Sequence, residues 1–63
     1  MLYKVAVQDI NPPPYVVINS RRVSIQPGTI LDVYKVYEGY FLVWNEQVAN
    51  TFFTISTDAC RPV

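Results

Sequence analysis

The chain has 63 residues, with five basic and five acidic side chains, no histidine and a single cysteine. A chain of this length can hold one domain, and it buries only about 60% of the surface that it exposes when unfolded. The balanced charge argues against a protein built to neutralise phosphates. The lack of histidine and the single cysteine argue against a zinc site and an internal disulfide. We therefore predict one domain over residues 1–63, without a metal or cofactor.

The sequence carries no sign of membrane insertion or secretion. No stretch approaches the roughly 20 apolar residues that a membrane-spanning helix requires. Residues 1–4 lead directly into a strand-like segment, and no long apolar run of the signal-peptide kind follows them. We expect a cytoplasmic protein with no membrane partner, residing in the host cytoplasm if its source is viral.

Apolar and polar residues alternate in short stretches, which is typical of β-strands with one buried face. In chain order, we predict strands over residues 2–8, 15–18, 21–25, 29–37, 40–45, 51–56 and 60–63. The stretch 29–37 has apolar side chains on both faces, so we expect it to be central in the sheet. Hydrophobic residues make up 51% of the chain, and many are β-branched or aromatic, which suits a dense β core.

The connections between these strands contain the residues that tight turns need. Pro27-Gly28 suits a type II turn, and Glu38-Gly39 suits a two-residue hairpin turn in which the glycine has a positive φ. Asn19-Ser20 is a further turn. Residues 57–59 are expected to form a single helical turn capped by Thr57 or Asp58. No segment has a sustained helical period, so the fold class is all-β.

The alternation also predicts which side chains form the core. The expected buried set consists of apolar residues from the predicted strands: Val5, Val7, Ile25, Ile30, Val33, Phe41, Val43, Phe53 and Ile55. Short strands joined by tight turns are the layout of a small β-barrel.

The order of elements resembles that of Src-homology-3 (SH3) domains. Leu2-Tyr3 stands where that family's ALYDY-like motif begins, and residues 9–20 take the place of its long loop. The stretch 23–33, VSIQPGTILDV, is similar to the family's LSFxxGDxLxV stretch, and residues 40–43 occupy the position of its paired tryptophans. Residues 51–56 match the strand before its short helical turn, and residues 61–63 resemble its closing strand.

The resemblance implies a small five-stranded, partly open SH3-like barrel that binds protein partners. In the related fold the long loop lies beside neighbouring aromatics, so the implied partner-binding residues are Tyr3, Pro12, Pro13, Pro14, Tyr15 and Tyr40. The chain departs from the family's groove for proline-rich peptides. Thr54 or Ile55 replaces a groove proline, no tyrosine follows Tyr40, and Asp9 is the only acid in the long loop.

The segment Pro12-Pro13-Pro14-Tyr15 has two interpretations. It fits PPxY, the pattern that WW domains bind, because a preformed polyproline helix presents proline and tyrosine to aromatic slots. The alternative is an extended loop that leads into a strand and packs Tyr15 on the barrel.

Arg21 and Arg22 form the only basic pair. They could contact nucleic-acid phosphates or an acidic partner, or they could be a solvated pair whose side chains point to opposite faces of a strand.

Five aromatic residues also have two interpretations: Tyr34, Tyr37, Tyr40, Trp44 and Phe52. They could form an exposed surface for binding a protein or stacking on nucleic-acid bases, or they could fill the barrel. We expect at least two of them to be partly exposed.

No constellation of catalytic residues is visible. The chain lacks histidine, its carboxylates are scattered, and its only glycines, Gly28 and Gly39, lie in turns. We therefore do not expect an enzyme. Cys60 is interpreted as a buried thiol in a reducing compartment, or alternatively as a reactive thiol or a partner in an intermolecular disulfide.

The leading hypothesis is a small non-enzymatic protein-binding module, of the kind that serves as a phage or bacterial accessory protein by binding and modulating a larger target. One alternative is nucleic-acid binding through exposed aromatics with Arg21 and Arg22. Another is a structural subunit of a homo-oligomer or particle, in which barrel edges pair between copies.

Overall fold

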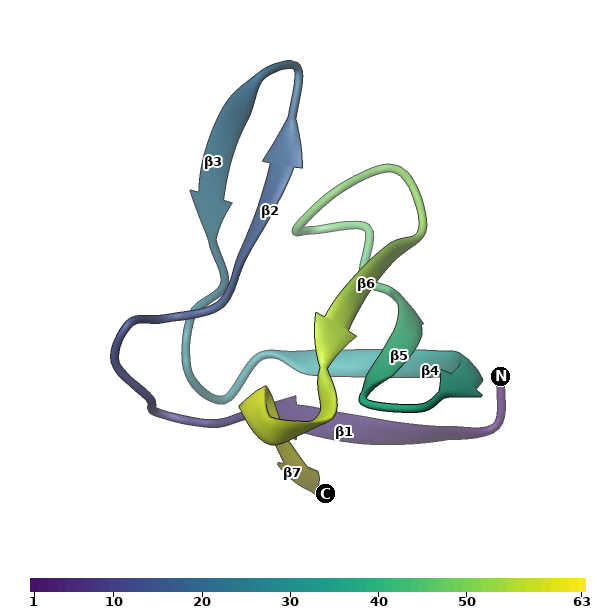
Figure 1. Cartoon of the computed structure of the whole chain (residues 1–63). Coiled ribbons are helices and arrows are strands. Elements are labelled where there is room, and N and C mark those ends of the chain that lie inside the picture. The colour runs from purple at the N-terminus through teal and green to yellow at the C-terminus, as the bar shows by residue number, and fades with distance from the viewer.

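The structure is a computed structural model that describes residues 1–63, and it contains two antiparallel sheets (Figure 1). The larger sheet has the strand order β6-β5-β4-β1-β7. Its strands are β1 (Tyr3–Val7), β4 (Ile30–Tyr37), β5 (Tyr40–Trp44), β6 (Phe53–Ser56) and β7 (Cys60–Pro62). The smaller sheet is a hairpin of β2 (Tyr15–Ile18) and β3 (Arg21–Ser24), and a short 3-10 helix, η1 (Thr57–Ala59), joins β6 to β7.

The all-β class and all seven predicted strands are confirmed, with ends that differ by at most two residues. The predicted central strand is also confirmed, because β4 lies in the middle of the five-stranded sheet. None of the helical structure has the length and apolarity that a bilayer crossing needs.

The predicted glycine turns are confirmed. Gly28 has a φ of +83°, and the N–H of Thr29 donates to the carbonyl of Gln26 at 3.2 Å, as a type II turn requires. Gly39 has a φ of +86° in the two-residue connection between Tyr37 and Tyr40, which pair directly.

The β2–β3 hairpin uses a different turn. Asn19 and Ser20 have φ values of +50° and +64°, the signs that a type I′ turn requires at both central positions. The hairpin rises away from β1 in Figure 1, but its base belongs to the core, since Val16 and Ile25 are buried there. The N–H of Ile25 donates to the carbonyl of Pro14 at 2.9 Å and closes this base.

Most of the predicted core is confirmed, and every buried side chain is apolar. Seven of the nine predicted residues are buried: Val5, Val7, Ile25, Val33, Val43, Phe53 and Ile55. Ile30 was predicted wrongly, because it pairs with Ala6 on the outer face and is 41% exposed. Its neighbour Leu31 pairs with Val5 and is fully buried.

A β-bulge interrupts the simple side-chain alternation of β4 after Val33. Val33 pairs with Val43, but the next pair joins Lys35 to Leu42, so Tyr34 is an extra residue. An extra residue reverses which side chains face inward, since the period of a strand is two. After the bulge, Val36 pairs with Phe41 and shares its face of the sheet.

Two amide side chains fasten the connections to the sheet. The Nε2 of Gln8 donates to the carbonyls of Asp58 and Cys60, each at 3.0 Å, and ties η1 to the end of β1. The Nδ2 of Asn45 donates to the carbonyl of Ile30 at 2.8 Å and fastens the β5–β6 connection. The predicted helical turn over residues 57–59 is thus confirmed and held in place.

The predicted cap of this helical turn is wrong. The Oγ of Ser56, rather than a side chain of Thr57 or Asp58, caps η1 by accepting from the N–H of Asp58 at 3.2 Å. The reason is positional, because Thr57 already lies within the turn and the cap is the residue that precedes it.

Two adjacent phenylalanines provide a test of the inner and outer faces. Phe53 is 7% exposed and Phe52 is 49% exposed. We expect Phe53→Ala to lower the free energy of unfolding by roughly 3–5 kcal/mol, because it leaves a cavity in the core. Phe52→Ala should cost about 1 kcal/mol or less. Chemical denaturation followed by circular dichroism measures both values, and equal losses would contradict the assignment of faces.

Gly39 provides a test of the hairpin turn. A β-carbon built at Gly39 meets no atom within 4 Å, so any cost of substitution arises from its φ of +86°. We expect Gly39→Val to destabilise the protein by about 1–2 kcal/mol, since a β-branched residue disfavours this conformation. Gly39→Asn should recover much of that loss, because asparagine tolerates the left-handed region. Equal denaturation midpoints for the valine variant and the unmodified chain would refute the argument.

Candidate functional site

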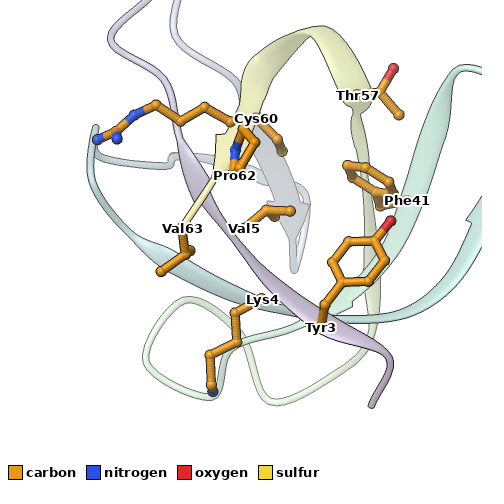
Figure 2. A pocket seen from close by; sticks show the side chains of 9 residues that line it. Tyr3, Lys4, Val5, Phe41, Thr57, Cys60, Pro62 and Val63 are labelled. Atoms are coloured by element: carbon orange, nitrogen blue, oxygen red, sulfur yellow. The ribbon is translucent and has the colours of Figure 1, made fainter.

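The clearest concave surface lies where β1 lacks a neighbour along half of its length. β7 pairs with residues 5–7 of β1, so the segment from Tyr3 to Lys4 has no strand on that side. A hollow of about 380 Å³ opens beside it (Figure 2). Its walls come from residues 3–5 of β1, Phe41 of β5, Thr57 of η1 and residues 60–63. We call this hollow the β1 groove.

Two aromatic rings form the apolar centre of the β1 groove. Tyr3 and Phe41 meet edge to face, with ring centroids 6.2 Å apart and an interplanar angle of 88°, and Figure 2 shows them side by side. Tyr3 lies on the same strand face as buried Val5, yet it is 45% exposed because β7 ends before it. Phe41 was predicted to be buried, but it is only partly covered.

The charged side chains around the β1 groove are both basic. Lys4 is already paired, because its Nζ lies 2.6 Å from the Oδ1 of Asp32, and in Figure 2 it points away from the two rings. Arg61 has no carboxylate within ion-pair distance. Among the charged side chains of the groove walls, Arg61 is therefore the one without an ion-pair partner. Because Arg61 pairs with Ala6, its side chain lies on the face of the sheet opposite Tyr3 and Val5.

Cys60 lies in the wall of the same groove. It is partly buried and packs against the core, and this burial raises the pKa of its thiol to about 11. A thiol with a raised pKa holds little thiolate at neutral pH, and the thiolate is the reactive form. The structure therefore favours the interpretation of Cys60 as a largely protonated, packed thiol.

The five aromatic residues for which the sequence allowed two interpretations all lie outside the core. The prediction that at least two of them are partly exposed is therefore confirmed. Phe52 meets Tyr34 at a centroid distance of 5.1 Å and Trp44 at 5.0 Å. Tyr37 and Tyr40 stack at 4.7 Å beside the hairpin turn. The only aromatic residue in the buried core is Phe53.

The residues predicted to bind a partner are divided among three places. Tyr3 lies in the β1 groove, and Tyr40 stacks on Tyr37 at the end of the β4–β5 hairpin. Tyr15 begins β2, and the connection before it is mostly exposed, with Pro12 and Pro13 exposed and Pro14 partly covered. No ring contact joins the three tyrosines, so they do not form one aromatic cluster.

Arg21 and Arg22 lie in β3, where both are exposed and neither has a carboxylate partner. Arg21 pairs with Ile18 and Arg22 with Val17, which places neighbouring side chains on opposite faces of the hairpin, as predicted. The guanidinium of Arg22 lies 4.4 Å from the ring centre of Tyr15, a cation–π contact.

The sequence analysis missed the contributions of Phe41, Thr57, Arg61 and Pro62 to the β1 groove. One signal could have indicated them. The predicted final strand was shorter than the first strand, so it could not cover the whole of its neighbour.

No three His, Cys, Asp or Glu side chains lie close enough together to hold a metal ion. Comparisons with protein-family models, with curated proteins and with solved structures find no match for this chain.

The raised pKa of Cys60 predicts its reactivity. We expect iodoacetamide to alkylate the folded protein slowly at neutral pH, with a rate that rises toward pH 11. In the unfolded chain the rise should centre near the ordinary value of 9.0. A fast reaction of the folded protein at neutral pH would contradict the burial of the thiol.

The same shift predicts how stability depends on pH. Because the unfolded thiol loses its proton first, the unfolded chain binds fewer protons between pH 9.0 and about 11. The raised pKa of Cys60 therefore stabilises the folded state fully below pH 9.0. This stabilisation is lost as the pH rises from 9.0 to about 11. Cys60→Ala should remove this part of the pH dependence of stability, so the difference between the two chains isolates the contribution of the thiol.

Proposed function

We propose that this chain is an SH3-like barrel that acts as a non-enzymatic protein-binding module. Several features support the barrel: a first strand, a long connection containing a hairpin, a turn at Gly28, three meander strands, a short helical turn and a closing strand occur in the order of that family. The small size suits an accessory protein of bacterial or phage origin that binds and modulates a larger target in the cytoplasm.

The observation that carries the binding proposal is the β1 groove. It places two partly exposed aromatic rings, Tyr3 and Phe41, beside a stretch of β1 whose backbone pairs with β4 on one side and with no strand on the other. Large rigid rings contribute strongly to binding, and an extended peptide can pair with a free strand edge.

The charge of the groove indicates the kind of peptide that it would bind. The unpaired cation is Arg61, and no acidic side chain lines the walls. We therefore propose an extended, apolar segment of a protein partner that carries an acidic residue next to its apolar anchor. The apolar anchor would rest on Tyr3 and Phe41. The neighbouring acidic residue of the extended peptide would point to the opposite face, where its carboxylate would pair with the guanidinium of Arg61.

A second candidate function is nucleic-acid binding through the β2–β3 hairpin. No acidic residue occurs between Asp9 and Asp32, so the hairpin carries the charges of Arg21 and Arg22 without compensation. Tyr15 lies under Arg22 and offers a ring for base stacking. Binding of this kind would weaken steeply with added salt and would be lost in an Arg21→Glu, Arg22→Glu double variant.

A peptide selection tests the proposed groove. The protein is used to select ligands from a random peptide library, and the dissociation constants of the selected peptides are measured by fluorescence polarisation. We expect apolar peptides with an acidic residue, and we expect Arg61→Glu and Tyr3→Ala each to weaken binding about tenfold or more. Arg22→Glu makes the same change of charge on the distant hairpin and should alter binding by about twofold or less.

The pattern of losses distinguishes the binding surfaces. Weakening by Arg22→Glu alone, or by Tyr15→Ala or Tyr40→Ala with no effect at Arg61, would place the peptide outside the β1 groove. A library that yields no specific peptide would contradict peptide binding. Circular dichroism of each variant confirms that the fold is intact.

A further inference from the structure

We infer that the free edge of β6 is a self-association site, at which two copies of this chain pair antiparallel and join their five-stranded sheets. The inference concerns a different edge strand from the one beside the β1 groove, and it does not depend on the proposed peptide binding. In the sheet, β6 pairs with β5 on one side and with no strand on the other (Figure 1).

The two edge strands of the sheet differ in how they resist pairing with another chain. β7 has three residues and contains Arg61, which is charged, and Pro62, which lacks a backbone N–H. Both features discourage the addition of a strand. β6 contains neither a charge nor a proline, and no charged residue occurs between Glu46 and Asp58. An uncharged strand rich in β-branched and aromatic residues is the kind that pairs with its own copy.

The direction of the backbone groups shows which of them are free. The N–H of Thr57 donates to the carbonyl of Gly39, just before β5, at 3.1 Å. Because N–H and C=O directions alternate along a strand, the backbone groups of Phe53 and Ile55 face β5, and those of Thr54 and Ser56 point outward. Thr54 and Ser56 are also exposed, so an added strand can reach these groups.

In one register, every outward-pointing backbone N–H and C=O group of β6 forms a hydrogen bond with the second copy. If a two-fold axis passes beside Ile55, each Thr54 lies opposite the Ser56 of the second copy, and the two residues exchange both hydrogen bonds. Ile55 then faces its own counterpart, which gives a β-branched cross-strand pair. A register centred on Thr54 would instead place Ser56 opposite Phe52, which lies outside the strand.

Charge supports a second copy as the occupant of this edge. A symmetric pairing places identical segments together, so a charged edge would bring like charges together. The β6 edge avoids this repulsion because it carries no charge. The strand has only four residues, so we expect a weak dimer that forms at high protein concentration.

Amide hydrogen exchange measured by NMR tests the site directly in the unmodified protein. On raising the concentration from micromolar to millimolar, the amides of Thr54 and Ser56 should gain protection by about tenfold or more. The amide of Ile55 bonds to β5 in both states and serves as the internal control. Over the same range, sedimentation equilibrium should show the average mass rising toward twice that of the monomer.

A matched pair of variants completes the test. Thr54→Lys places like charges together in the paired edges and should keep the protein monomeric, whereas Val17→Lys adds the same charge on the exposed hairpin and should leave association unchanged. A protein that stays monomeric at millimolar concentration, with Thr54 and Ser56 unprotected, would overturn the inference. So would a mass increase that persists in Thr54→Lys, because another surface would then be responsible.

Discussion

An extra residue in the central strand decides how this small sheet divides its two faces. At Tyr34, β4 has one residue more than β5, and the side chains that follow change faces. Leu31 and Val33 point into the core before the bulge, and Val36 shares the face of Phe41 after it. Lys35 and Tyr37 are thereby directed outward.

The core is almost entirely aliphatic, and the other aromatic residues lie outside it. Apart from Phe53, the buried residues are valine, isoleucine, leucine and alanine. A core enclosed by a few short strands is narrow, and branched aliphatic side chains can fill it at high packing density. Tyr34, Trp44 and Phe52 instead pack against one another on the surface. Their exposed area is available for contact with another molecule, as is typical of binding surfaces.

Both proposed association surfaces lie where a strand of the sheet has no neighbour on one side. β7 is shorter than β1, and the uncovered end of β1 becomes the groove beside Tyr3. At the opposite edge of the sheet, β6 pairs only with β5. The two surfaces differ in chemistry, since Arg61 marks the groove and the β6 edge is uncharged. They would therefore bind different occupants.

The sequence by itself determined the local features of this protein. Strand positions, the positive φ of Gly28 and Gly39, and most of the core follow from alternation and turn chemistry, which depend on residues close together in the chain. The tertiary structure alone decided that Leu31 rather than Ile30 is buried, that Tyr34 is a bulge, and that Tyr3 meets Phe41 in a groove. The period of two specifies that neighbouring side chains face opposite ways. Which face is inside, and where a strand ends relative to its neighbour, depends on pairing between residues that are far apart in the sequence.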